Sequence, residues 1–111
     1  MISTNAPFYV SKSRIFFERR ELNLLLSLYG RMVAAGEWRD YAMDALDDRA
    51  LFSIFRRASE APLYQVEKRP ELARRQGAFS VLSAAGVVLR RGHELAPVLQ
   101  ALEPKRLRAV D

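Results

Sequence analysis

The sequence predicts an α+β fold, a two-layer sandwich in which an N-terminal helix and a C-terminal helix cover an antiparallel meander of about five short strands. Three observations lead to this prediction. Apolar residues recur at three- and four-residue steps over residues 18–35 and again over 93–102, whereas short segments between residues 38 and 90 alternate apolar with polar side chains. A sheet with one solvated face needs helices over its other face, which gives two layers.

Length and composition fit one small domain. The chain has 111 residues, of which 50% are hydrophobic, and we expect a flexible arm at 1–14 followed by a single domain at 15–111. The absence of cysteine excludes disulfides, thiol nucleophiles and cysteine-ligated metal sites. The arm lacks the apolar core of a signal peptide, and no apolar run approaches the roughly 20 residues of a membrane span. We therefore expect a cytoplasmic protein without membrane contact.

Residues 18–35 carry the clearest helical pattern. Glu18 and Glu21 in the first turn suit the positive end of the helix dipole, and Gly36 is placed to stop the helix. The predicted apolar stripe comprises Leu22, Leu25, Leu26, Tyr29, Met32 and Val33, with Leu24 and Leu28 beside it. This surplus of leucine leaves two alternatives: the helix is buried on more than one side, or it forms a homodimer contact.

The first strand is predicted at residues 38–45, where alternation places Trp38, Asp40 and Asp44 on one face. A later strand at residues 63–68 alternates in the same way.

Residues 50–57, between these two strands, are ambiguous. Their aromatic and β-branched content favours a strand, whereas their spacing also fits a helix over residues 48–58 capped by Asp47 or Asp48. We favour the strand, followed by a hairpin loop at residues 58–62.

The second half of the chain predicts one hairpin and one helix. A charged connector at residues 69–77 leads to a hairpin of strands 78–82 and 87–90, which ends at Gly92. The helix at residues 93–102 presents Leu95, Val98, Leu99 and Leu102 on one face. Beyond it, residues 107–110 fit an edge strand.

Charge is distributed unevenly along the chain. Residues 1–48 carry six basic and seven acidic groups, a net charge of −1, whereas residues 49–111 carry twelve basic and six acidic groups, a net charge of +6. The C-terminal half therefore produces the positive field, which attracts nucleic acid or an acidic protein surface.

Ten of the eighteen basic residues form five adjacent pairs after residue 55. These pairs are Arg56-Arg57, Lys68-Arg69, Arg74-Arg75, Arg90-Arg91 and Lys105-Arg106. Arg guanidinium groups bind carboxylate and phosphate through two parallel hydrogen bonds, so the first four pairs predict a binding site for an acidic protein partner or nucleic acid. The predicted site residues are Arg56, Arg57, Lys68, Arg69, Arg74, Arg75, Arg90 and Arg91.

Strand ends decide whether these pairs meet. We expect strands 50–57 and 87–91 to end at one edge of the sheet and Lys68-Arg69 to lie at the other, so one continuous patch is not required. Sheets that bind nucleic acid also place stacking aromatics among the basic groups, and Tyr64 and Phe79 are available.

A second interpretation assigns the charges to solubility alone. The preference for Arg over Lys then reflects the codon usage of a GC-rich genome. The protein would act as a structural or dimerising partner through the helix at residues 18–35.

The sequence leans away from an enzyme and predicts no cofactor or metal. Asp40 and Asp44, with the neighbouring Asp47 and Asp48, could serve acid–base chemistry or hold a divalent ion, but turn formation and pairing with Arg explain them equally well. His93 is the only histidine, so it cannot build a two-histidine metal site. Glycine-rich phosphate loops and nucleophile motifs are absent from the sequence.

Six blocks in fixed order resemble a known family. They are Phe17-Glu18-Arg19-Arg20-Glu21-Leu22, Trp38-Arg39-Asp40-Tyr41, Arg56-Arg57-Ala58-Ser59-Glu60, Leu63-Tyr64 with Glu67-Lys68, Leu72-Ala73-Arg74-Arg75-Gln76-Gly77, and Arg91-Gly92-His93. Over residues 14–110 the chain is similar to small alphaproteobacterial proteins grouped as domain of unknown function 2794. The resemblance implies a cytoplasmic housekeeping or regulatory protein, and it carries no activity, cofactor or catalytic residue.

Overall fold

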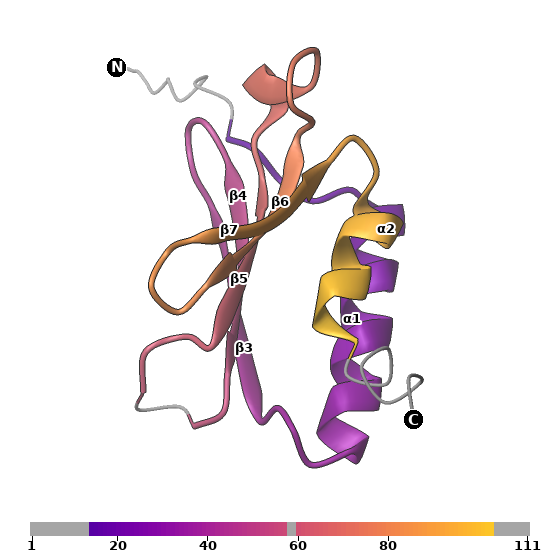
Figure 1. Cartoon of the computed structure of the whole chain (residues 1–111), viewed down its shortest axis with the longest axis vertical. Helices are drawn as coiled ribbons and strands as arrows, with labels where there is room; N and C mark the ends of the chain where they lie inside the picture. Colours follow the sequence, from indigo (N-terminus) through magenta and orange to yellow (C-terminus); the bar gives the residue numbers. More distant parts are fainter. Residues whose placement is uncertain (1–13, 58–59, 104–111) are drawn as a thin grey trace, which may run out of the picture.

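The computed structural model describes residues 14–57 and 60–103, and it confirms the predicted α+β fold (Figure 1). In chain order the elements are α1 (Arg19–Ala34), β3 (Asp40–Ala45), β4 (Ala50–Phe55), β5 (Tyr64–Lys68), the 3-10 turn η1 (Pro70–Leu72), β6 (Phe79–Ser83), β7 (Val88–Gly92), α2 (Leu95–Leu99) and the 3-10 turn η2 (Gln100–Leu102). The strands pair in the order of the sequence, each antiparallel to the next. Both helices lie on the same side of the sheet (Figure 1). Residues 1–13 of the predicted arm at 1–14, Lys105-Arg106 and the predicted edge strand at 107–110 lie outside the described residues.

The ambiguous segment at residues 50–57 forms strand β4. It pairs with β3 on one side and β5 on the other, and its inward residues Ala50, Phe52 and Ile54 are each 1% exposed. A helix over residues 48–58 is excluded, because this segment pairs with an antiparallel strand on each side.

Helix α1 begins and ends as its sequence indicates. The backbone N–H of Glu18, the N-cap, donates to Oε1 of Glu21 at 2.7 Å, one half of a capping box. At the other end, the N–H of Gly36 donates to the carbonyl of Val33 and that of Glu37 to the carbonyl of Met32. This is a Schellman motif, and Gly36 adopts the left-handed φ of 79° that the motif requires.

The predicted apolar stripe of α1 is only partly correct. Glu21, Leu25, Leu28 and Met32 are buried, so Leu28 belongs to the core. Leu26 and Val33 are 39% and 41% exposed, because they lie towards the flank of the helix beside β3, where Tyr29 contacts Tyr41.

Strand β3 begins at Asp40, two residues later than predicted. The N–H groups of Glu37 and Trp38 both donate to the carbonyl of Met32, so the chain is still leaving the helix at this point. Trp38 is buried in the core and does not share a strand face with Asp40 and Asp44.

The helix predicted at residues 93–102 begins two residues later. Helix α2 begins at Leu95, after His93, and continues as the 3-10 turn η2. The four predicted apolar residues, three in α2 and Leu102 in η2, are all buried, and α2 packs against β6 and β7. The hairpin between β6 and β7 turns through residues 83–86 as predicted, with Gly86 at a φ of 84°.

The core fills the space between the two helices and the middle strands. From the sheet it contains Ala50, Phe52, Ile54, Val66, Phe79 and Val81; from the helical layer it contains Leu25, Leu28, Met32, Leu95, Val98, Leu99 and Leu102. Beside β3 the core ends in a cluster of aromatic rings. The ring centroid of Tyr41 lies 4.8 Å from that of Tyr29 and 5.0 Å from that of Phe52.

Candidate functional site

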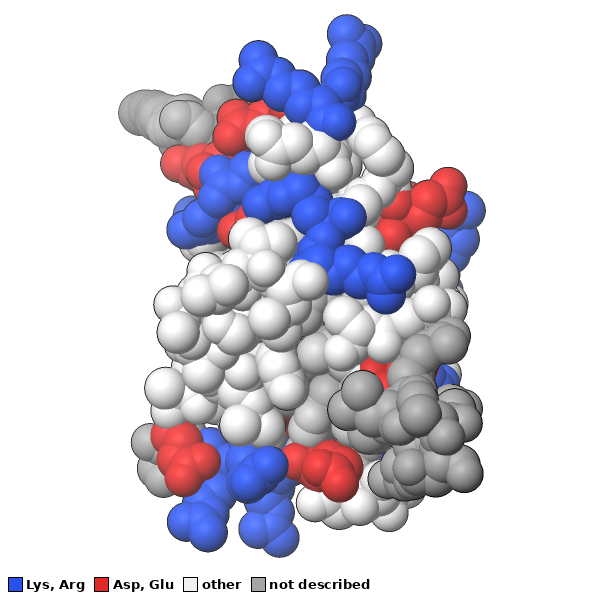
Figure 2. All heavy atoms as spheres, in the orientation of Figure 1, with Lys and Arg blue, Asp and Glu red and all other residues white. Residues whose placement is uncertain are grey.

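The four described basic pairs occupy both ends of the sheet. Neighbouring strands alternate in direction, so β5 and β7 finish at the end where β4 begins, the upper end in Figure 1. Lys68-Arg69 and Arg90-Arg91 therefore lie together at the upper end, with the loop that carries Arg74-Arg75. Arg56-Arg57 lies at the lower end. Figure 2 shows Lys and Arg side chains gathered at both ends of this face, with uncharged surface between them.

The expectation that strands 50–57 and 87–91 end at the same edge is wrong. Strands β4 and β7 are three places apart in the sheet, so they run in opposite directions. A single patch containing all the predicted site residues does not form.

The ammonium group of Lys68 is already hydrogen-bonded within the fold. Its side chain points to the helical layer, where Nζ donates to Oε1 of Glu21 at 2.8 Å and to the carbonyl of Phe16 at 3.0 Å. Only 13% of its side-chain surface is exposed. Lys68 therefore joins the sheet to the start of α1 and contributes little to an outer binding surface.

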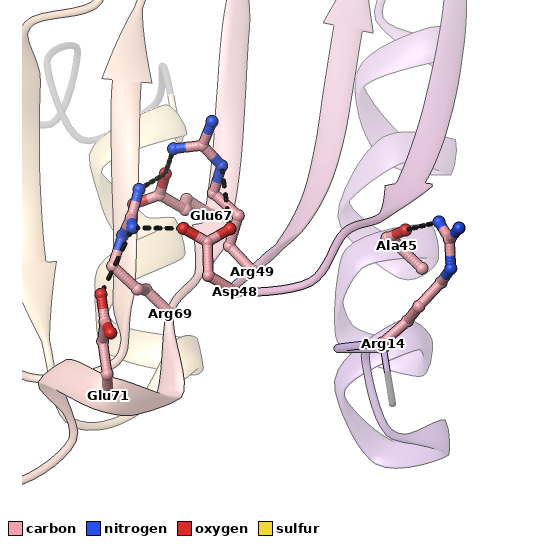
Figure 3. Close-up of polar contacts among 7 residues, drawn as sticks. All are labelled: Arg14, Ala45, Asp48, Arg49, Glu67, Arg69 and Glu71. Atoms are coloured by element: carbon pink, nitrogen blue, oxygen red, sulfur yellow. Dashed lines mark hydrogen bonds and ion pairs between the residues drawn. The ribbon is translucent and has the colours of Figure 1, made fainter. Parts of the chain in front are cut away.

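The guanidinium of Arg69 is also paired with carboxylates, on the opposite face of the sheet (Figure 3). Its guanidinium lies 3.3 Å from Glu67, 3.0 Å from Asp48 and 3.5 Å from Glu71, and Arg49 approaches Glu67 from the other side at 3.4 Å. The hydrogen bond to Glu67 is the main cause that raises the pKa of Arg69 above its ordinary value, and Coulombic attraction to Glu67 and Asp48 adds to it.

Glu67 is the centre of this network, and it was not among the residues that the sequence predicts for the site. Its side chain is 7% exposed, so the two guanidinium groups that flank it compensate a buried charge. The available signal was alternation, since Glu67 lies in the strand and Arg69, two residues later, directly follows its end.

The upper loop is fixed against β7 by two glycines. A Cβ atom on Gly77, which has a φ of 104°, would lie 2.2 Å from the carbonyl carbon of Gly92. The N–H groups of Arg75 and Gly77 both donate to the carbonyl of Leu72, which closes the loop on η1. The backbone that carries Arg74 and Arg75 is thereby held beside the end of β7.

Arg74, Arg75, Arg90 and Arg91 are the remaining basic residues at the upper end, and we call them the arginine patch. The first three side chains are exposed and Arg91 is half-buried. Arg90 lies opposite the core residue Val81 and Arg91 opposite Ser80, so these two side chains leave β7 on opposite faces. Among residues 14–57 and 60–103, no carboxylate lies within 4.0 Å of any of the four.

Arg91 extends the patch onto the outer face of the sheet. It lies opposite Ser80 in the register of β6 and β7, and Ser80 is fully buried. Within the described part of the chain, Nη1 of Arg91 and Oγ of Ser80 are buried atoms without a hydrogen-bond partner. Arg91 therefore keeps an unused donor at the inner margin of the patch.

Arg56 and Arg57 form a separate lower group. Together with Arg39 and Trp38 they line a shallow hollow at the end of α1, and Arg57 lies 3.9 Å from Glu60. This group is the natural internal comparison for the arginine patch.

The acidic residues do not converge on a metal or catalytic centre in the segments that the structure describes. Asp40 accepts a hydrogen bond from the N–H of Tyr41, and Asp48 pairs with Arg69. In the same segments no three His, Asp or Glu side chains lie close enough to hold one metal ion. His93 is exposed, in the turn before α2.

Comparison with known proteins gives a family. Residues 15–99 match the sequence model of a protein family of unknown function, DUF2794. No curated protein and no solved structure matched the chain. Within the described segments, neither helix has the length and apolar character needed to cross a bilayer.

Proposed function

We propose that this chain, which belongs to the family of unknown function DUF2794, is a non-enzymatic binding module that engages an acidic protein surface through the arginine patch. The supporting observation is a contrast between neighbours. At the same end of the sheet Arg49, Lys68 and Arg69 are each paired with a carboxylate, whereas the four patch residues have none among the described residues. Unpaired guanidinium groups are the donors that bind carboxylates with two parallel bonds.

An acidic protein is favoured over nucleic acid by the position of the aromatic residues. Domains that read single-stranded bases on a sheet stack them on exposed rings among the basic groups. Here Phe79 is 8% exposed and Tyr64 packs against the core from the helix-facing side, so neither ring is presented beside the patch.

The backbone beneath the patch favours a preformed site. Arg74 and Arg75 lie in a loop held by the Leu72 carbonyl and by the contact between Gly77 and Gly92. A loop that is already ordered loses less conformational entropy on binding than a flexible one. A cytoplasmic regulatory role is part of this proposal.

Binding of defined polyanions tests the proposal. The probes are a fluorescent polyglutamate peptide, single-stranded DNA, duplex DNA and RNA of similar charge, titrated with the full chain across a salt series. We expect the peptide to bind and its affinity to fall as salt rises. Tighter binding of a nucleic acid, with a linear dependence of log K on log salt, would replace the acidic-protein proposal with a nucleic-acid one. Failure of all four probes at low salt would overturn both.

Self-association through α1 is the alternative function. Leu26 and Val33, with the half-buried Leu22 and Tyr29, form an apolar stripe on the flank of α1 beside β3. If this stripe forms a homodimer contact, sedimentation velocity at micromolar concentration gives a dimer that Leu26→Asp dissociates. A clean monomer over the whole concentration range would remove this alternative.

A further inference from the structure

The helical layer does not fully cover the edge of the sheet formed by β3. Tyr41 and Met43 of β3 point to the helical side, since they lie opposite the buried Ile54 and Phe52, yet they are 37% and 46% exposed. Beside them runs the exposed stripe of α1, and Phe16, Leu22 and Met43 line an apolar hollow at the upper end of β3. We call this surface, made of the α1 stripe with Tyr41 and Met43, the β3 flank.

The outer edge of β3 also retains backbone hydrogen-bonding groups. The N–H of Leu46 donates to the carbonyl of Arg49, so Leu46 bonds towards β4. In an antiparallel pair every second residue bonds to the partner strand, and the residues between them direct their N–H and C=O groups away from it. In β3 the outward residues are therefore Tyr41, Met43 and Ala45. Side chains cap part of this edge: Asp40 accepts from the N–H of Tyr41, and Arg14 donates to the carbonyl of Ala45. In the described residues, Met43 has no such cap. The edge can therefore accept one more short strand.

Charge indicates what kind of strand fits. Asp40 and Asp44 lie on the other face of β3 and are exposed. An added strand would thus be apolar on its helix-facing side and basic on the side of the two aspartates. A second copy of β3 does not meet this requirement, because pairing two copies brings four carboxylates to one seam, and like charges at a strand edge oppose association.

We propose that the β3 flank is the docking site of this chain's own C-terminal segment, residues 105–110. In an extended strand, Leu107 and Ala109 would share one face, and Arg106 and Arg108 the other. The first pair suits Tyr41 and the α1 stripe, and the second suits Asp40 and Asp44.

The segment is long enough to reach this edge. Glu103 and Trp38 line the same hollow, of about 370 Å³, and Trp38 precedes β3 by two residues. If fully extended, the eight residues from Pro104 to Asp111 would reach about 26 Å, whereas the six residues of β3 span about 20 Å. A strand that starts beside Asp40 would therefore be long enough to cover Tyr41 and Met43.

Amide hydrogen exchange on the full chain tests this docking. The probe is the N–H of Met43, with the N–H of Val66 in the central strand as a control for folding. We expect the Met43 amide to exchange more slowly than an unstructured amide, and Leu107→Asp to accelerate it by on the order of tenfold or more without changing Val66. The matched control Leu89→Asp, which puts the same charge on an exposed position of the opposite edge, leaves Met43 unaltered.

A charge reversal tests the polar face of the same contact. Arg106→Asp with Arg108→Asp should expose Met43, and adding Asp40→Arg with Asp44→Arg should restore its protection. Fast exchange of Met43 in the unaltered chain, or protection that Leu107→Asp does not change, would overturn the proposal. Protection that appears only at high protein concentration, together with a dimer in sedimentation, would instead place a second copy on the flank and would equally overturn it.

Discussion

The ammonium group of Lys68 lies 2.8 Å from a carboxylate oxygen of Glu21, and both side chains are nearly buried, at 13% and 10% exposed. This ion pair connects the end of β5 to the first turn of α1. Glu21 also accepts from the N–H of Glu18, so the same carboxylate caps the helix and anchors it to the sheet. The pair is structural, although Lys68 is one of the residues that the sequence assigns to a binding surface.

Removing one partner of this pair should destabilise the fold strongly. Lys68→Met leaves the Glu21 carboxylate buried without its cation, and we expect a loss of about 3 kcal/mol in the free energy of unfolding. The double variant Lys68→Met with Glu21→Met should lose less than the single one, because no buried charge remains. Urea denaturation of the three proteins measures this; equal stability of Lys68→Met and the parent would contradict a buried ion pair.

The carboxylate of Glu67 should be needed to hold Arg49 and Arg69 together. Glu67→Gln leaves two guanidinium groups close to each other, and we expect a loss of roughly 2–3 kcal/mol in unfolding free energy. Glu71→Gln is the control, since Glu71 contacts the same Arg69 but is 63% exposed, and such surface pairs contribute about 0–1 kcal/mol. Similar losses for both variants would mean that burial of Glu67 does not set the strength of the network.

Two glycines should respond in opposite directions to alanine. Gly30 lies in α1, and the space that an added Cβ would occupy there has no other atom within 4 Å, so Gly30→Ala should stabilise the protein by about 0.5–1 kcal/mol. Gly77→Ala forces a carbon atom into the backbone of Gly92 and strains a left-handed φ, so thermal unfolding should move to a clearly lower temperature. A neutral Gly77→Ala would show that the upper loop does not pack on β7.

The hydroxyl of Tyr29 should make the fold sensitive to alkali. Burial is the first cause that raises the pKa of Tyr29 above 10.0, followed by the negative charge of Asp40 and by Tyr41. A group whose pKa is raised by folding stabilises the fold below its unfolded pKa and loses that contribution as pH rises through the folded value. We expect the free energy of unfolding to fall above pH 10.0, and Tyr29→Phe to remove part of that fall. Parallel pH profiles for the two proteins above pH 10.0 would contradict this assignment.

Local patterns in the sequence were sufficient for most of the fold. The Schellman end at Gly36, the strand predicted at residues 63–68 and the apolar face of α2 each depend on a few neighbouring residues, and all three are confirmed. The stripe of α1 was less predictable, because Leu26 and Leu28 are equally apolar, and only the position of α2 and the sheet decides which is buried.

The candidate site was harder to predict because pairing across the sheet selects which basic residues remain available. Lys68 and Arg69 resemble Arg90 and Arg91 in sequence, but the former meet Glu21 and Glu67 in space. The sequence could have predicted the direction of β7 relative to β4, because strands three places apart in an antiparallel meander run in opposite directions.

The most direct test of the arginine patch compares two double variants of equal charge. Arg74→Ala/Arg75→Ala and Arg56→Ala/Arg57→Ala each lower the net charge from +5 to +3, at opposite ends of the sheet. In titrations with the polyglutamate peptide at low salt, we predict that the first variant loses affinity by on the order of tenfold, because two charge-assisted hydrogen-bonding groups are removed, and that the second stays close to the parent. Equal losses in both variants, or none in either, would contradict a specific site at the upper end.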